Sequence, residues 1–369
     1  MISAFLLRYE PTLYLAPALI VLAATELYFW HLHGVLCLLL VVAAGVAHTS
    51  VARPKRPAEE LRGVPVIVRH MGKNLAHADD QIDGVIALLD ATRSAAPDRA
   101  EALAQVVRER GVHAVCEALV QHPSTSSFVV PAYQLLHRLL LSPEHKGEII
   151  NAFNVDSLMG SITTPLRVWL GAHRRVSKEE PPDVTLLAKG FGVLAQLVDA
   201  HVAMQDGALE LRVPELVVQS LALLARFAAA HDQLAPVGLR CLFHCCFQHA
   251  QAKRQFAVDA DGLRVLLRTL SLQPRSREVQ LHGLGLLYDC LSHTDGADMH
   301  GLRIDAVDAG VLTILADARA NFPGVQTIVD SATQMEAVLG KLANAVGERA
   351  PPDGASAARR RPRIVEDDD

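Results

Sequence analysis

The chain has 369 residues; half of them are apolar, 5% are aromatic, and 40 acidic residues outnumber 35 basic ones. A formal net charge of −5 gives no general attraction to a polyanion, so we do not expect nucleic-acid binding. A core that must be built from Leu, Val, Ala and Ile favours helices over strands.

The N-terminal part is dominated by an apolar run from Leu13 to Val51, which contains no Lys or Arg. As one helix this run would be about 58 Å long, roughly twice the ~30 Å thickness of a bilayer core. Two apolar helices, 12–30 and 34–51, would use the whole run. Residues 1–52 are therefore predicted to form a transmembrane hairpin. One span followed by an interfacial segment, or a cleaved signal peptide, are the alternatives.

Aromatic and basic residues mark the predicted membrane edges. Tyr28, Phe29 and Trp30 would lie in the headgroup layer at the tip of the hairpin, where amphipathic rings collect. The predicted basic linker, 53–64, begins with Arg53, Lys55 and Arg56. Because positive charge is retained on the cytosolic side, we expect an integral membrane protein with its C-terminal part in the cytosol. The endoplasmic reticulum is the first expectation for the organelle, and the mitochondrial outer membrane is the second.

Residues 65–346 read as a nearly continuous series of amphipathic helices. Segments such as "VPELVVQSLALLARFAAAH" and "VQLHGLGLLYDCLSH" place apolar residues at i, i+3, i+4 and i+7, and no segment alternates as a strand would. Such helices cannot bury their apolar faces singly. They are predicted to form one helical domain.

A longer repeat lies over this helical pattern. "VVRERGVHAVCEALV" returns as "IINAFNVDSLMGSI", "FAVDADGLRVLLRTL" and "IDAVDAGVLTILADA": a helix end, a turn residue, then an apolar helix. The predicted turn residues are Gly111, Asn154, Gly262 and Gly310. Each copy is succeeded by a longer helix, such as "VQLHGLGLLYDCLS", at separations of roughly 43 to 48 residues.

This order of helices resembles the armadillo repeat, over about residues 100–342 and most closely over 251–291. HEAT-like helix pairs share the period, but the three-helix rhythm favours armadillo. The fold class we expect is therefore all-α: a right-handed α-solenoid of about five armadillo-like repeats with a helical cap before them, preceded by the transmembrane hairpin.

The resemblance implies a concave groove lined by the third helix of each repeat, which in peptide-binding members presents an Asn within an L-x-N-L pattern. "LHRL", "LAQL", "LFHC" and "LYDC" place Arg138, Gln196, His244 and Asp289 at these asparagine positions. These residues are the candidate binding residues. None is Asn, so a partner other than a nuclear-import cargo is expected.

No enzyme motif is present in the sequence. There is no G-x-S-x-G, H-E-x-x-H or phosphate-binding loop, and we expect no catalytic residue, cofactor or small-molecule substrate. Cys241, Cys245 and His249 share a helix face, but the first and last are about 12 Å apart along it, too far for one zinc ion. We expect no metal site, and we expect free thiols in the core.

The tail, 347–369, "GERAPPDGASAARRRPRIVEDDD", has too few apolar residues to fold and is predicted to be disordered. Taken together, these features favour a membrane-anchored armadillo-like adaptor that binds a protein partner at the cytosolic face of an organelle. An armadillo-type regulator of nucleotide exchange on Hsp70, suggested by "QAKRQFAVDADGL", and a hairpin protein that shapes membranes are the alternatives.

Overall fold

The structure is a computed structural model that describes residues 63–93, 98–174, 181–199, 201–292 and 297–347. The chain divides into two units, Met1–Glu60 and Leu61–Asp369, and all described residues belong to the second. The predicted membrane hairpin (1–52) lies outside them, together with Tyr28, Phe29, Trp30, Arg53, Lys55, Arg56 and the tail from residue 348. Within the described part, no helix is both long and apolar enough to cross a bilayer.

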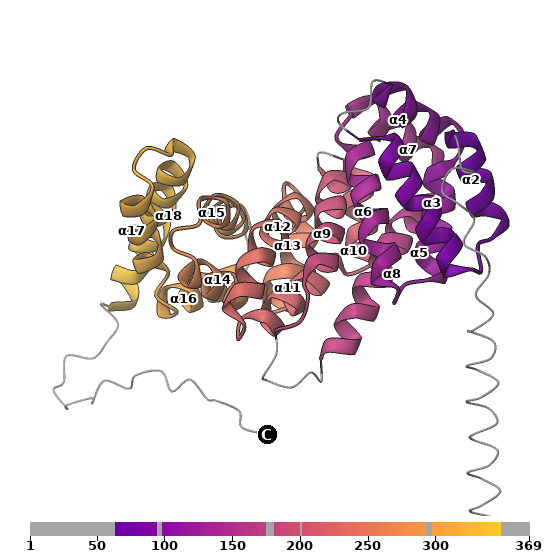
Figure 1. Cartoon of the computed structure of the whole chain (residues 1–369). Helices are drawn as coiled ribbons and strands as arrows, with labels where there is room; N and C mark the ends of the chain where they lie inside the picture. The colour runs from indigo at the N-terminus through magenta and orange to yellow at the C-terminus, as the bar shows by residue number, and fades with distance from the viewer. Residues whose placement is uncertain (1–62, 94–97, 175–180, 200, 293–296, 348–369) are drawn as a thin grey trace, which may run out of the picture. The chain divides into compact units, whose positions relative to one another are not determined.

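All regular structure in the described ranges is helical, which confirms the predicted all-α class (Figure 1). Two helices come first, α2 (Val64–Lys73) and α3 (Ala78–Ala91). The others come in triplets: α4 (Arg99–Arg108), α5 (Gly111–Gln121) and α6 (Ser126–Leu140); α7 (Pro143–Ala152), α8 (Val155–His173) and α9 (Thr185–Val198); α10 (Val202–Glu210), α11 (Val213–Leu224) and α12 (Ala228–Cys246). Next come α13 (Ala250–Arg254), continued by the π-helix η2 (Gln255–Asp259), α14 (Gly262–Leu272) and α15 (Arg277–Ser292); and α16 (Ala297–Asp308), α17 (Val311–Asn321) and α18 (Gln326–Gly347).

Helix α14 shows how the apolar spacing produces the packing. Leu263, Leu266, Leu267 and Leu270 are buried at i, i+3, i+4 and i+7, so they form one apolar stripe along the helix. Arg264, between them in sequence, is exposed on the opposite face. Stripes of this kind join into one apolar core that extends from α2 to α18.

The second helix of most triplets starts after a left-handed residue. The residue before α5, α11, α14 and α17 has a positive φ in each case: Arg110 (61°), Arg212 (50°), Asp261 (53°) and Gly310 (84°). The remaining second helix, α8, begins differently, because Asn154 is extended and its side-chain oxygen accepts a hydrogen bond from the helix start. The same sharp turn therefore recurs in four of the five triplets.

Two of the predicted turn residues have another role. The turns expected at Gly111 and Gly262 lie one residue earlier, and both glycines are the first residues of their helices. A Cβ atom would lie 2.9 Å from the carbonyl oxygen of Val106 at Gly111, and 2.5 Å from that of Phe256 at Gly262. Both glycines are thus required by close backbone approach and not by a left-handed conformation.

Helices at the same place in successive triplets contact one another. The third helices form one such series, in which α3 contacts α6, α6 contacts α9, α9 contacts α12, α12 contacts α15 and α15 contacts α18 (Figure 1). The second helices form another, from α5 through α8, α11 and α14 to α17. Residues on the third helices are therefore brought together although they are far apart in sequence.

Two buried glutamines show that α2 and α3 correspond to the second and third helices of a triplet. The side-chain nitrogen of Gln81 on α3 donates to carbonyl oxygens ten and seven residues earlier, at 2.9 and 3.0 Å. Gln280 on α15 makes the same two bonds at the same offsets, at 3.0 and 3.2 Å, to the end of α14. Carbonyls at a helix C-terminus lack partners within the helix, so each glutamine satisfies that end and fixes the angle of the turn.

Candidate functional site

The four residues predicted at asparagine positions lie on four consecutive third helices. Arg138 is on α6, Gln196 on α9, His244 on α12 and Asp289 on α15, and each of these helices contacts the next. Their side chains differ in charge and size, so each makes a different set of contacts with the neighbouring helices.

Arg138 is engaged within the fold. Its Nη1 atom donates a hydrogen bond to the carbonyl oxygen of Leu89 at 2.9 Å, near the C-terminal end of α3. This bond joins α6 to the preceding third helix and satisfies a carbonyl of the last turn. The guanidinium of Arg138 therefore stabilises the packing of α3 on α6. Gln196, on α9, is half-buried.

His244 belongs to a small polar network between α7, α9 and α12. Its Nδ1 atom lies 3.1 Å from a carboxylate oxygen of Asp199, and the Lys146 ammonium donates to the Asp199 carbonyl at 3.0 Å. Burial lowers the pKa of His244, the Asp199 carboxylate opposes that shift, and the cations Arg240 and Lys146 add to it. Since its pKa is lowered from about 6.5, the imidazole is mainly neutral at pH 7.

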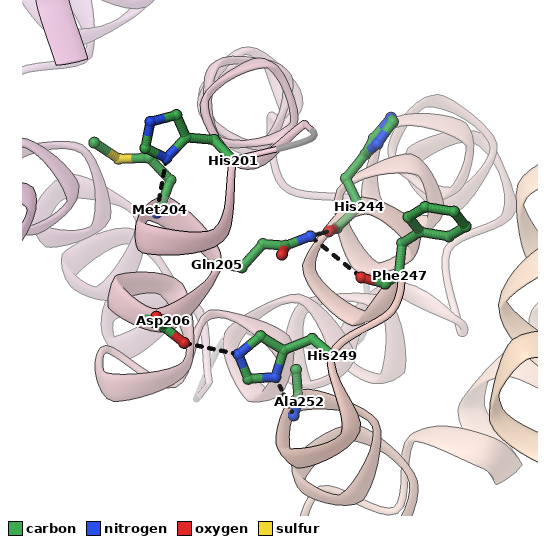
Figure 2. Close-up of polar contacts among 8 residues, drawn as sticks. All are labelled: His201, Met204, Gln205, Asp206, His244, Phe247, His249 and Ala252. Carbon is green, nitrogen blue, oxygen red and sulfur yellow. Dashed lines mark hydrogen bonds and ion pairs between the residues drawn. The ribbon is translucent and has the colours of Figure 1, made fainter. Parts of the chain in front are cut away.

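A side chain of α10 holds the backbone at the C-terminal end of α12, where His244 lies (Figure 2). The Gln205 side chain donates to the carbonyl oxygens of His244 at 2.8 Å and of Phe247 at 3.3 Å. Beside it, His249 accepts a hydrogen bond from the backbone of α13 and lies 2.9 Å from Asp206 of α10 (Figure 2). The end of α12 is thereby held at a defined position.

Asp289 forms a buried ion pair. One of its carboxylate oxygens is 2.9 Å from the ammonium of Lys253, and the two side chains are 13% and 6% exposed. A lysine this deeply buried needs such a counter-charge, because an isolated ammonium is strongly disfavoured away from water. The pair joins α13 to α15.

Two cavities lie on the surface formed by α12 and α15. The first, which we name the aromatic cavity, has a volume of about 420 Å³ and is lined by Phe243, Phe247, Gln248, Lys253, Gly285, Tyr288 and Asp289. The second, which we name the cationic cavity, has a volume of about 310 Å³ and is lined by Pro236, Val237, Arg240, Arg277, Glu278, Leu281 and His282. They are neighbours, since Phe243 of the first and His282 of the second have ring centroids 6.1 Å apart.

Arg240 is the central charge of this surface. Its Nε atom is buried and has no hydrogen-bond partner among the described residues. The guanidinium lowers the pKa of His137 on α6, His244 on α12 and His282 on α15, and in each case burial is the larger cause. One arginine thus influences imidazoles on three third helices.

The cysteines are buried and chemically protected. All five in the described ranges are buried thiols that form no disulfide, as predicted. Burial raises the pKa of Cys116 and Cys290 to about 12, so neither forms a thiolate at neutral pH. The pKa of Cys241 is raised as well, by its contact with the Cys245 thiol and by burial. The described ranges contain no group of three or more side chains placed to hold a metal ion.

Of the residues that line the two cavities, the sequence-based prediction named Asp289 and missed the others. It selected one position on each third helix, whereas Arg240 precedes His244 by one helical turn and therefore shares its face. His282 lies two helical turns before Asp289 and therefore shares its face of α15. Extending the asparagine positions by one and two turns would have identified both.

No protein family and no curated protein matches this sequence. Among solved structures, two engineered proteins from the Northeast Structural Genomics Consortium are similar in fold. The first has a TM-score of 0.53 at 15% identity, over 75% of this chain and 98% of the other. The second has a TM-score of 0.53 at 16% identity, over 75% and 96% of the two chains. At this level of identity the likeness concerns the fold alone.

Proposed function

We propose that the chain is a membrane-anchored, armadillo-like scaffold that binds a protein partner at the cytosolic face of an organelle membrane. The helical part would be a right-handed α-solenoid of five three-helix repeats, with α2 and α3 as its cap. The recurring left-handed turn and the contacts between equivalent helices support this assignment. In such an array each repeat buries its apolar face against the next.

The observation that carries the binding role is the pair of adjoining cavities on α12 and α15. Most of their lining residues lie on the third helices, which in the proposed solenoid line one continuous surface. The aromatic side chains Phe243, Phe247 and Tyr288 offer apolar contact area. The guanidinium of Arg240 lines the second cavity and adds a positive charge there. Aromatic residues and Arg are the types that contribute most to protein interfaces.

The membrane anchor is proposed from the sequence. The apolar run from Leu13 to Val51 is long enough for two spans, and the cations at 53–56 favour a cytosolic position for the helices C-terminal to them. The endoplasmic reticulum is proposed first and the mitochondrial outer membrane second.

We favour this scaffold over an Hsp70 exchange regulator because the segment that suggested the regulator is used in internal packing. Lys253 in that segment is paired with Asp289, and the Gln255 side chain donates to the carbonyl of Leu209 at 3.3 Å. These contacts assign Lys253 and Gln255 to packing between helices. A role of the hairpin in membrane shaping stays a prediction.

The test uses the full chain with one tag at each end, expressed in cells. Protease added to intact isolated membranes should digest both tags, whereas protection of the C-terminal tag would contradict the cytosolic position of the helices. The same protein should co-purify with a cytosolic protein that is lost from the Arg240→Glu variant. The matched control is Arg268→Glu, which changes the charge equally on the exposed face of α14. Equal capture by both variants would contradict binding at this surface.

A further inference from the structure

The aromatic cavity is lined by three aromatic rings. The rings of Phe243 and Phe247 are 5.5 Å apart between centroids and 39° from parallel, and Tyr288 lines the same space. Gly285 keeps the cavity open, because a Cβ atom there would lie 3.1 Å from the Phe243 ring. Lys253 and Asp289 balance each other at 2.9 Å, so the polar part of the lining carries no net charge. An aromatic or large aliphatic group matches such a lining.

The cationic cavity has more positive than negative groups in its lining. It contains two guanidinium groups, Arg240 and Arg277, against one carboxylate, Glu278. The Nε of Arg240 is itself buried, so a ligand in the cavity would meet the rest of the Arg240 guanidinium, which lines it together with Arg277. Arginine forms short, charge-assisted hydrogen bonds to carboxylates in a planar geometry.

The distance between the two cavities sets the spacing of the groups that fill them. Arg240 and Phe243 are three residues apart on α12, as are His282 and Gly285 on α15, which corresponds to about 4.5 Å along each axis. In an extended peptide, side chains on one face recur every second residue, about 6.6 Å apart. Adjacent residues point to opposite faces. Two residues is therefore the shortest spacing that fills both cavities.

From these observations we propose that the surface of α12 and α15 binds an extended acidic segment of the partner protein. A large apolar side chain of that segment fills the aromatic cavity, and an Asp or Glu two residues away pairs with Arg240. This inference rests on the proposed scaffold function and names the chemistry of its partner. The complementary charge of Arg240 and Arg277 is the argument for this occupant.

Acidification should strengthen this binding. His282 faces Arg240, His244 and Glu278; His244 faces Asp199, Arg240 and Lys146; His137 faces Arg240 and Lys189. Burial and the nearby cations lower the pKa of all three imidazoles, which are therefore mainly neutral at pH 7. Each protonation adds positive charge beside the cationic cavity, so a carboxylate ligand should bind more tightly as pH falls below 6.5 and the imidazoles gain protons.

The experiment is a selection of random 12-residue peptides on the full chain in lipid nanodiscs, with affinity measurements on the enriched sequences. We expect enriched peptides to carry Asp or Glu two residues from a large apolar residue. Their affinity for Arg240→Glu should fall at least about tenfold. Gly285→Val, which fills the aromatic cavity without changing charge, should produce a similar loss. Arg268→Glu, the matched charge control, should remain within about twofold of wild type.

Several results would overturn the inference: enrichment of neutral or basic peptides, no enrichment at all, equal binding to Arg240→Glu, or no loss when the acidic residue of a peptide becomes an amide. These outcomes are distinguishable from failure of the proposed function. A cytosolic partner that is still captured through α12 and α15 would leave the scaffold standing and remove only the acidic motif. Loss of that capture as well would remove both.

Discussion

The buried pair of Lys253 and Asp289 allows a sharp prediction about stability. The two charged atoms lie 2.9 Å apart, and at an effective dielectric of about 20 unit charges at this distance attract by about 6 kcal/mol. Desolvation of both ions offsets much of this attraction in the wild type. In Asp289→Asn the desolvation cost of the ammonium remains while its counter-charge is lost.

We therefore expect Asp289→Asn to lower the free energy of unfolding by about 3 kcal/mol, within the range for breaking a buried ion pair from one side. For a domain of this size that corresponds to a fall in Tm of about 6 °C or more. The measurement is thermal unfolding of the full chain in nanodiscs, monitored by circular dichroism at about 222 nm. Replacing both partners, Lys253→Met with Asp289→Leu, should recover most of the loss.

The chain supplies its own control for this prediction. Asp90 on α3 lies as far beyond Gln81 as Asp289 lies beyond Gln280, and it pairs with Arg93 at 3.1 Å. Its side chain is 55% exposed, so Asp90→Asn should cost less than about 1 kcal/mol. Equal and small losses in the two variants would refute the assignment of Asp289 as the buried counter-charge of Lys253.

Three further predictions concern packing, capping and pH. Gly262→Ala should destabilise the chain by at least about 2 kcal/mol, because the new Cβ would meet a backbone oxygen. Gly160 has open space around it, so Gly160→Ala should stabilise the chain by up to about 1 kcal/mol. Equal Tm shifts in the two variants would contradict the close approach at Gly262. Gln280→Ala should cost about 2 kcal/mol in denaturant unfolding by leaving two buried carbonyls without their donor, and an unchanged midpoint would argue against that role. Burial lowers the pKa of His231, so its contribution to stability is present above about pH 6.5 and is lost as pH falls below that value. His231→Gln should therefore flatten the dependence of Tm on pH between about 7 and 5, and an unaltered slope would count against this explanation.

The local structure of this chain could be predicted from sequence because it results from apolar spacing. The i, i+3, i+4, i+7 pattern of α14 fixes both its helical form and its buried face. The turns were harder to place. Glycine signals both a left-handed turn and a close backbone approach, and Gly262 serves the second while Asp261 makes the turn.

The neighbours of each candidate residue could not be predicted. The helical repeat assigns Arg138 and Asp289 to third helices, but it does not say what lies across from them. Arg138 meets the carbonyl of Leu89, 49 residues away, and Asp289 meets Lys253 on another helix, α13. The role of Arg240 depends on the packing of α12 against α15, which places Arg240 and Arg277 in the lining of one cavity.

The measurement that tests the central claim most directly is photo-crosslinking in intact cells from a photoactivatable residue at Leu281, which lines the cationic cavity. The scaffold account predicts a covalent adduct with a cytosolic protein from this position, its absence when the same residue is placed at Arg268 on α14, and its loss in the Arg240→Glu background. Adducts of equal yield from both positions, or an adduct with a luminal protein, would contradict it.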